Sequence, residues 1–390
     1  MKISRRALIV GGASAYAWSS RKANAKTPTK GGSGGRLIEV SSLEDSGAGT
    51  LRAALSAIGP RRIVFKVAGE IWSRDTLSVY QPHVTIEGET APSPGITILG
   101  DRIRIRANDV VFRHIRLRVG ALQGSAPNNR DGFTIDGSLD GRKPIHGVLI
   151  ENCSVSWAVD ELLQIWGENS SQIVVRNCIF AEALNHSTHP KGAHSMGPII
   201  GPLTKGIVFE RNLLAHNSAR NPVVSGGAEA IVVNNLVYNP GYYGIHFYPW
   251  AATPRPTLAA VIGNVVIAGP NTKNNLLALA DGLNPGSRIY YRDNIAIGVN
   301  AFDENELLRK GHGVGTSPFV VHPPLSLVPI DDILPSRKVY DHLLEHAGAT
   351  PKTRDPIDRR IISEVRNRTG SIRDWPQDPR LDPNSNLRAR

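Results

Sequence analysis

At residues 148–166 the chain reads VLIENCSVSWAVDELLQIW, and this stretch decides the fold. It contains two short apolar segments, 148–150 and 162–166, joined by a turn that carries Asp160 and Glu161. Segments of this length bounded by polar residues are typical of strands. Two carboxylates at the start of an apolar strand are costly to bury unless a cation or a hydrogen-bond donor meets them. An isolated acidic pair is more often a solvated turn than a site, so its meaning depends on the surrounding architecture.

Short strand-like segments recur from residue 63 to residue 291, and helical patterns are nearly absent between residues 60 and 300. Several segments are followed by an asparagine and a second short apolar segment, at intervals of 23 to 35 residues. These asparagines are Asn152, Asn177, Asn212, Asn235, Asn264 and Asn294. A unit of two or three strands with a variable period is typical of a solenoid. We therefore predict an all-β fold, a right-handed parallel β-helix whose asparagines hydrogen-bond from coil to coil in a ladder.

The same register predicts the surroundings of the two cysteines, Cys153 and Cys178. Each directly follows one of the asparagines. The corresponding residues of the other coils are Leu213, Leu236, Val265 and Ile295, so this position should point into the core. An exported protein can form disulfides, but strands in neighbouring coils lie about 4.8 Å apart. That spacing exceeds the preferred Cβ–Cβ separation of about 3.8 Å in a disulfide. We expect two stacked, buried thiols, neither of them catalytic.

The formal net charge of the chain is +11. A basic balance of this size suggests an acidic partner, namely nucleic acid, anionic lipid or a polyanionic glycan. No run of Lys and Arg with interleaved aromatic residues is present, which argues against nucleic acid. No segment is long and apolar enough to span a bilayer. The sequence thus favours a glycan over a nucleic acid or a membrane.

The N-terminus has the features of an export signal. Arg5-Arg6 forms a twin-arginine pair, followed by an apolar run at 7–18 and by Ala23-Asn24-Ala25, a small-x-small pattern of the kind cleaved by signal peptidase. The apolar run is too short to serve as a membrane span. We predict that residues 1–25 are a twin-arginine-type signal peptide and that the protein is secreted or periplasmic.

The rest of the chain divides into three parts. Residues 26–36 form a Gly-rich linker, which we expect to be a flexible joint. A short helix at about 50–58, with Thr50 as its N-cap, precedes the strands and is expected to cap the coil. Residues 37–300 are predicted to form the β-helix and the catalytic domain.

Residues 301–390 differ from the coil in composition, being Pro-rich and then charged. Two short helices are predicted here, at 336–346 and 355–367. We expect this C-terminal extension to pack along the coil and cover an exposed edge. It is not expected to fold as a separate catalytic domain.

A β-helix gives the acidic pair a setting. Asp131 opens a strand one coil before Asp160, and equivalent positions of adjacent coils lie close together on the outer wall. Asp131, Asp160, Glu161 and the amide oxygen of Gln164 can then present a cluster of oxygens. Oxygen ligands select Ca²⁺ over Zn²⁺.

Three histidines lie in the polar loop 185–195, namely His186, His189 and His194. They would suggest zinc, but no carboxylate or cysteine accompanies them at ligand spacing, so we do not expect a zinc site. Lys191 in the same loop is a candidate for binding a substrate carboxylate. From spacing alone, a solvated loop lysine is an equally good interpretation.

Arg220 lies in the segment HNSARNP at 216–222, after a strand and on the corresponding side of the coil. An arginine before Asn-Pro is ordinarily a turn residue. Its position on the wall that carries the acidic cluster makes it a further candidate for the site.

Together these segments resemble the pectate lyases of polysaccharide lyase family 1. The resemblance is carried by GGSGG at 31–35, DSGAGTLR at 45–52, IVF at 63–65, VTIEGETAP at 84–92, CSVSWAVDE at 153–161, HSMG at 194–197 and HNSARNP at 216–222. It covers nearly all of the chain after the expected signal peptide. The motifs together are far more specific than any one of them alone.

The resemblance implies a Ca²⁺-dependent enzyme that cleaves polygalacturonate, the backbone of pectin, by β-elimination. It implies that Arg220 is the base and that Asp131 and Asp160 are calcium ligands. A further family Asp, four residues after the second ligand, corresponds to Gln164 here. Glu161 is expected to compensate for the lost charge.

Two other positions depart from the family pattern. The family often has a second Arg five residues after the base, where this chain has Ser225. The family's substrate-binding Lys corresponds to Met196, which leaves Lys191 and Lys205 as replacements, with His194 as a further substrate-binding candidate. These departures argue against strong activity on plain polygalacturonate, but they leave the base and the core calcium site in place.

Two other functions remain open. A β-helix hydrolase such as a polygalacturonase needs two acidic groups flanking the scissile bond. An Asp-Asp pair on a coil would be expected, yet the only such pair, Asp331-Asp332, lies in the extension. A non-catalytic glycan-binding protein is the other alternative, supported by Gln164, Met196 and Ser225. In every case we expect a monomer whose partner is an acidic polysaccharide, with no nucleic acid and no membrane.

Overall fold

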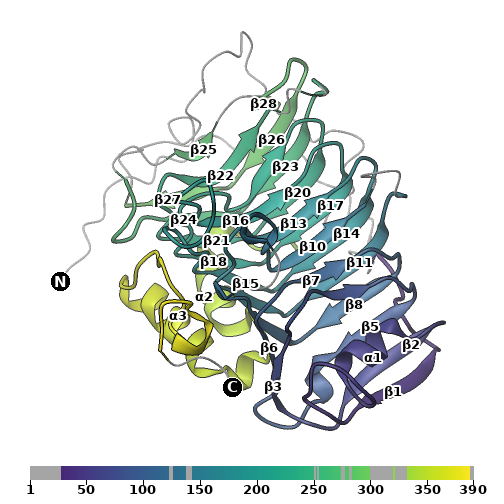
Figure 1. Ribbon diagram of the computed structural model, residues 1–390. Helices are drawn as coiled ribbons and strands as arrows, with labels where there is room; N and C mark the ends of the chain where they lie inside the picture. Colours follow the sequence, from purple (N-terminus) through teal and green to yellow (C-terminus); the bar gives the residue numbers. More distant parts are fainter. Residues whose placement is uncertain are drawn as a thin grey trace.

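The structure is a computed structural model that describes residues 28–122, 126–137, 143–249, 252, 254–273, 277–280, 283–298, 319–320 and 332–386. The expected signal peptide and most of residues 301–331 lie outside the described residues. Within the described part, the chain winds into coils that stack along one axis (Figure 1). Three parallel sheets run along the stack, and the chain visits them in turn. The predicted parallel β-helix is confirmed.

The three sheets contain eleven, nine and eight strands of the described residues. The eleven-stranded sheet consists of β1 (Arg36–Val40), β2 (Arg61–Phe65), β5 (Val84–Glu87), β8 (Val110–Arg113), β11 (His146–Glu151), β14 (Ser171–Arg176), β17 (Lys205–Glu210), β20 (Glu229–Val233), β23 (Leu258–Ile262), β26 (Arg288–Arg292) and β28 (Phe319–Val320). The nine-stranded sheet consists of β3 (Gly69–Trp72), β6 (Ile96–Leu99), β9 (Ile115–Arg118), β12 (Ser154–Ser156), β15 (Ile179–Ala181), β18 (Leu213–Ala215), β21 (Leu236–Tyr238), β24 (Val265–Ile267) and β27 (Ile295–Ile297). The eight-stranded sheet consists of β4 (Leu77–Val79), β7 (Ile103–Ile105), β10 (Phe133–Asp136), β13 (Glu161–Trp166), β16 (Met196–Ile200), β19 (Val223–Ser225), β22 (Tyr243–Tyr248) and β25 (Leu277–Ala280). Because β28 pairs with β26, the sheet continues past residue 300, the boundary expected for the coil.

Side-chain alternation along each strand separates the core from the outer wall. In β11, Val148 and Ile150 are buried inside the coil, whereas Leu149 packs outside it against Val111 and Val174 of the neighbouring strands. Burial of both faces explains why this segment is continuously apolar.

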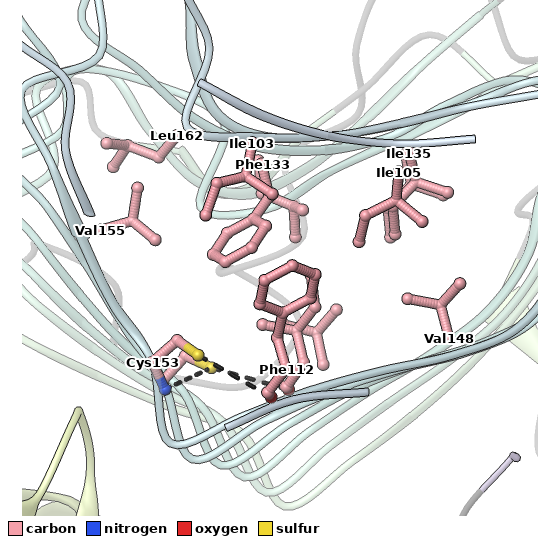
Figure 2. Close-up of a cluster of buried hydrophobic side chains, with 14 of the residues drawn as sticks. Ile103, Ile105, Phe112, Phe133, Ile135, Val148, Cys153, Val155 and Leu162 are labelled. Atoms are coloured by element: carbon pink, nitrogen blue, oxygen red, sulfur yellow. Dashed lines mark hydrogen bonds between the residues drawn. The ribbon is translucent and has the colours of Figure 1, made fainter. Parts of the chain in front are cut away.

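The interior of the coil is filled by side chains from all three sheets (Figure 2). Phe112 of β8 meets Phe133 of β10 edge to face, with ring centroids 5.3 Å apart at 69°. Val155 of β12 closes the third side. Edge-to-face contact is a favourable arrangement for aromatic rings.

Four stacked asparagines form the predicted ladder. Each lies at the bend where the chain leaves the eleven-stranded sheet, after β17, β20, β23 or β26, and enters the nine-stranded sheet. Asn212, Asn235, Asn264 and Asn294 lie on successive coils. Each of the first three donates its backbone N–H and its side-chain amide to the Oδ1 of the next asparagine, at 2.9–3.1 Å. The ladder satisfies amide groups that would otherwise be buried without partners.

The cysteines occupy the first two positions of this ladder, one residue away from the predicted alignment. Cys153 N–H points to the Sγ of Cys178 at 3.4 Å, and Cys178 N–H donates to Asn212 Oδ1 at 3.0 Å. Cys178 therefore aligns with Asn212 rather than with the residue after it. Asn152 and Asn177 instead fill the preceding bend position, where the backbone is left-handed (φ 49° and 54°). Asparagine suits both positions. The spacing of the asparagines alone therefore predicted the wrong alignment for these two coils. The prediction of two buried free thiols is confirmed.

Replacing Asn235 by alanine is expected to lower the free energy of unfolding by about 3 kcal/mol, because several buried polar groups lose their partners at once. Its amide donates to Phe209 O and Asn264 Oδ1, and its Oδ1 accepts from Asn212. Denaturant titration measures the loss. Asn294→Ala, at the half-buried end of the ladder, is the control and should lose about 1 kcal/mol. Equal losses at the two positions would contradict a cooperative ladder.

The start of the coil is capped as predicted, but the Gly-rich segment is not a flexible joint. Helix α1 (Leu51–Ser56) begins after Thr50, whose hydroxyl accepts the Ala53 N–H at 3.3 Å. Gly31 and Gly32 are buried, and a Cβ on Gly32 would lie 1.7 Å from the Arg61 carbonyl oxygen. Glycine is required there because two backbones touch. Single 3-10 turns occur at Gly88–Thr90, Pro127–Asn129, Pro351–Thr353 and Pro379–Leu381.

The C-terminal extension forms the two predicted helices, α2 (Ser336–His346) and α3 (Pro356–Asn367). Both lie beside the coil, in yellow in Figure 1. They cover the outer face of the nine-stranded sheet rather than an exposed edge, because that face is apolar. The residues that meet there include Ile179, Leu213, Leu236, Val339, Leu343, Ile361 and Val365. None of the helices in the described residues is both long and apolar enough to cross a membrane.

Candidate active site

A cleft of about 660 Å³ lies on the outer face of the eight-stranded sheet. Its floor is a row of residues in register across four strands: Gln164 of β13, Ile199 of β16, Val223 of β19 and His246 of β22. The remaining lining residues are Asp160, Glu161, Trp166, Lys191, Met196, Ala219, Arg220, Ser225, Tyr243, Phe247, Tyr248 and Pro249. The cleft is thus built mainly on rigid strands, a suitable base for a precise site.

Three carboxylates meet at one end of this cleft. Asp131 lies just before β10, while Asp160 and Glu161 lie at the start of β13. The parallel pairing of β10 with β13 places Asp131 beside Glu161, and Asp131 Oδ1 accepts the Glu161 N–H at 3.3 Å. Oxygens of the three carboxylates lie within 4.8 Å of one another, and all three residues are buried. The coil register had predicted that these residues would be neighbours.

The electrostatics of the cluster favour a cation. Burial and the nearby Asp160 charge raise the pKa of Asp131 to about 7, against the opposing effect of Thr134 and Arg102. The Thr134 hydroxyl donates to Asp131 at 2.8 Å, and Arg102 lies 3.4 Å away. Buried carboxylates this close repel each other, and a divalent cation would relieve the repulsion.

The donor set fits Ca²⁺ rather than a softer metal. Asp131, Asp160 and Glu161 offer only oxygens, which hard cations prefer. Gln164 lies beside them, with Nε2 3.4 Å from Glu161 Oε2. All four residues expected to bind the metal are therefore in one place, and Gln164 is also part of the cleft floor.

Arg220 reaches the same cluster from a later coil of the same sheet. It precedes β19 with a left-handed backbone (φ 60°), and its guanidinium forms an ion pair with the Glu161 carboxylate. Burial lowers the pKa of Arg220, while the charges of Asp160 and Asp131 oppose that shift. The side chain is one-quarter exposed and lines the cleft. A guanidinium in contact with both the acidic cluster and open cleft is more than a turn residue.

His189 and His194 lie behind Asp160, an arrangement that the sequence did not predict. Their rings are stacked, with centroids 3.7 Å apart and planes at 3°. Nε2 of His194 lies 2.8 Å from Asp160 Oδ1, and Nε2 of His189 lies 3.8 Å from the same atom. The histidines therefore do have a carboxylate nearby, from the preceding coil. Asp160, His189 and His194 each offer one ligand atom, and these atoms lie within 4.8 Å of one another.

The other expected residues are more scattered. Lys191 lines the cleft, as do Met196 and Ser225. Lys205 begins β17 in the eleven-stranded sheet, is exposed and does not line the cleft. His194 is buried behind Asp160 rather than lining the cleft.

Two further candidates from the sequence are His186, as a zinc ligand, and the Asp331-Asp332 pair, as the acidic groups of a hydrolase. His186 lies outside the stacked pair and contacts Asp374 of the extension, with Nδ1 3.2 Å from Oδ1. Of the Asp331-Asp332 pair, only Asp332 is described; it is exposed and lies just before α2. Neither His186 nor Asp332 lines the cleft.

Several aromatic residues of the cleft were missed at the sequence level. Tyr243, His246 and Tyr248 lie on β22, and Trp166 ends β13. Tyr248 is 56% exposed. The signal was present in the segment YYGIHFY at 242–248, which places aromatic rings on the strand that follows the Arg220 coil.

Comparisons with known proteins agree with this architecture. No protein-family model matches the chain. The chain is 31% identical over 345 residues to a protein named "Probable pectate lyase C" from Neosartorya fischeri. The aligned region covers 86% of this chain and 74% of that protein. A protein of the same name from Aspergillus terreus is 32% identical over 344 residues, with the same coverage.

Solved structures show the same fold at lower identity. The major cedar pollen allergen jun a 1 superposes with a TM-score of 0.60 at 16% identity, covering 84% of this chain and 92% of that one. A structure described as a pectate lyase bound to hexasaccharide superposes with a TM-score of 0.55 at 14% identity, covering 83% of this chain and 94% of that one. At these identities the likeness concerns the fold alone.

Proposed function

Since the chain belongs to the pectate lyase family, we propose that it cleaves polygalacturonate by Ca²⁺-dependent β-elimination in the cleft of the eight-stranded sheet. The observation that carries this proposal is the meeting of Arg220 with the carboxylates of Asp160 and Glu161 at one end of the cleft. This arrangement would bring a nitrogen base and an oxygen-rich cation site together on a surface that a polymeric substrate can reach.

In the proposed reaction, a base removes the proton on C5 of a uronate. The electron pair of the C5–H bond forms a C4=C5 double bond, and the C4–O4 bond breaks. The products are a new reducing end on one fragment and a 4,5-unsaturated uronate on the other. Oxygen O4 leaves with a proton taken from solvent.

Four side chains would hold the cation: Asp131, Asp160, Glu161 and Gln164. Bound there, Ca²⁺ would neutralise the uronate carboxylate and make the C5 proton more acidic. Asp131 anchors the cluster through Thr134 and Arg102, so the carboxylates keep their places on the wall of the cleft.

Arg220 is proposed as the base. A guanidinium must lose a proton to act in this way, and its ordinary pKa lies above about 12. Burial lowers the pKa of Arg220, which is the required direction. The ion pair with Glu161 aims the side chain at the end of the cleft where the cation site lies.

Lys191 and the tyrosines complete the proposed binding surface. Lys191 can pair with a uronate carboxylate, while Tyr243 and Tyr248 offer ring faces to sugar rings. Met196 and Ser225 add no charge to the cleft. The proposed enzyme therefore binds fully charged polygalacturonate with few cations of its own.

Adding a cation at this wall should improve substrate binding. Met196→Lys is expected to lower KM for polygalacturonate about five-fold without a change in kcat, because a partly exposed ion pair contributes about 1 kcal/mol to both ground and transition states. Initial rates at saturating Ca²⁺ measure both constants. Met196→Leu keeps the volume without the charge and should match the parent chain. An unchanged KM in the lysine variant would place the substrate elsewhere.

We also propose that residues 1–25 direct export by a twin-arginine route, in keeping with an extracellular polysaccharide as substrate. Changing Arg5-Arg6 to Lys-Lys should retain the protein inside the producing cell, as seen by fractionation. Recovery of that variant outside the cell at the parent level would contradict this route.

The decisive experiment for the function is ultraviolet absorbance during incubation with polygalacturonate, with Ca²⁺ and with a chelator. Unsaturated product forming only with Ca²⁺ supports the proposal. Reducing ends without unsaturated product would indicate a hydrolase. Glycan binding without any cleavage, across several uronate polymers, would indicate a binding protein.

A further inference from the structure

Two stacked imidazoles form the wall behind Asp160. The side chains of His189 and His194 are 1% and 6% exposed, so neither faces the cleft directly. Both Nε2 atoms point to the same carboxylate oxygen, Asp160 Oδ1, at 3.8 and 2.8 Å. Two buried rings converging on one oxygen of a proposed cation ligand need a reason beyond packing.

The hydrogen bonds assign the proton on His189. Its Nδ1 accepts the backbone N–H of Lys191 at 3.2 Å, so the proton of a neutral ring lies on Nε2. That N–H faces Asp160 but has no hydrogen-bond partner among the described residues. His194 is close enough to Asp160 to donate through its own Nε2–H. Asp160 Oδ1 thus faces two donors, whereas Oδ2 receives no hydrogen bond from the part of the chain that the structure describes.

The loop that carries the rings is itself fixed. His194 N–H donates to Asn185 O at 3.0 Å, and Asn185 N–H donates to Arg373 O of the extension at 2.8 Å. The rings therefore approach Asp160 from a tethered segment. Their place is set by the extension as well as by the coil.

We propose that His194 is a positioning residue that holds Asp160 Oδ1 and so presents the other oxygen of Asp160 to the cation, while the ring of His189 supports His194 by stacking against it. Through its Nδ1, His189 also fixes Lys191 at the edge of the cleft. This inference rests on the cation site of the proposed function. Outer residues that orient metal ligands typically change metal affinity by about 10- to 100-fold when they are replaced.

The test compares two replacements of His194. His194→Phe keeps a ring in the stack but removes the donor, whereas His194→Gln keeps an N–H near the position of Nε2. Titration calorimetry of the intact chain with CaCl₂ should show Kd raised about 10-fold by Phe and changed less than about three-fold by Gln. At saturating Ca²⁺, kcat of both variants should stay within about two-fold of the parent, because positioning acts through cation binding. His186→Phe, in the same loop, should leave Kd unchanged.

The Asp131→Asn variant tests the cation site separately from the positioning role of His194. If the parent binds Ca²⁺ and Asp131→Asn does not, the cation site stands. A normal Kd in His194→Phe would then overturn only the positioning role. If the parent does not bind Ca²⁺, both proposals fail.

A measurement without mutation guards against a misfolded variant. Long-range ¹H–¹⁵N spectra of the parent should show a proton on Nε2 of both rings. An Nδ1–H tautomer at either ring would overturn the assignment of donors to Asp160.

Discussion

Replacing Arg220 by alanine is expected to lower kcat on polygalacturonate by about 10³-fold, within the range that general-base catalysis supplies. The expectation rests on the contact between Arg220 and Glu161 and on the lowered pKa of the partly buried guanidinium. KM should change little, since Lys191 and the cleft floor remain. Rates of unsaturated-product formation at saturating Ca²⁺ measure the loss.

Two controls make the result specific. Arg220→Lys keeps the positive charge but not the planar, delocalised group, and should be nearly as inactive as alanine. Arg255→Ala removes an exposed arginine, 3.6 Å from Glu168, and should keep full activity. Thermal unfolding of each variant checks that the coil is intact.

Substantial residual activity in Arg220→Ala would point to a different base. His246 of the cleft floor would be the alternative. Burial and the charge of Arg220 lower its pKa to about 3, which makes it a weak base, and its Nδ1 is buried without a hydrogen-bond partner among the described residues. Arg220 therefore remains the better candidate.

Sequence alone predicted the fold because a solenoid is governed by contacts between neighbouring coils. The segment VLIENC at 148–153 carries a strand, a bend and an inward position, and the same order returns with each coil. The register error at Cys153 and Cys178 shows the limit of this reasoning. Two adjacent bend positions both favour asparagine, and only the ladder hydrogen bonds distinguish them.

The carboxylate cluster was predictable for the same reason, since Asp131 and Glu161 are neighbours on paired strands. The stacked histidines were not. Loop 185–195 returns to Asp160 along a path set by Arg373 and Asp374, about 190 residues later in the chain. No local pattern records such a contact. The same argument explains why we predicted from the sequence that the extension covers an edge, whereas in the structure it covers an apolar sheet face.

The extension is joined to the coil through Glu182, which is fully buried. It accepts hydrogen bonds from Arg360 at 2.7 and 2.8 Å, from Arg373 at 2.6 Å and from Trp157 Nε1 at 2.9 Å. Burial alone would raise the pKa of Glu182. The hydrogen bonds and charge of Arg360, together with Arg373, outweigh burial and lower the pKa to about 2 from an ordinary value of 4.5.

Glu182→Gln is therefore expected to lower the free energy of unfolding by about 3 kcal/mol at pH 7. Because the folded pKa lies below the unfolded one, this stability is present above about pH 4.5 and is lost as the pH falls toward 2. Denaturant titrations from pH 7 to pH 3 should show the two proteins converging. Glu70→Gln, which breaks an exposed pair with Arg380, should lose less than about 1 kcal/mol. A constant gap between Glu182→Gln and the parent across this range would contradict the assigned pKa.

The same variant should weaken the proposed cation site from a distance. Arg373 binds Glu182 through its side chain and holds Asn185 through its carbonyl, so it connects the buried carboxylate to the loop of His189 and His194. Loosening Arg373 should let that loop move and raise the Kd for Ca²⁺ in Glu182→Gln, even at temperatures where the coil is fully folded. Glu70→Gln touches the extension elsewhere and should leave Kd unchanged. If Glu182→Gln loses stability but binds Ca²⁺ like the parent, the extension supports the coil without setting the site.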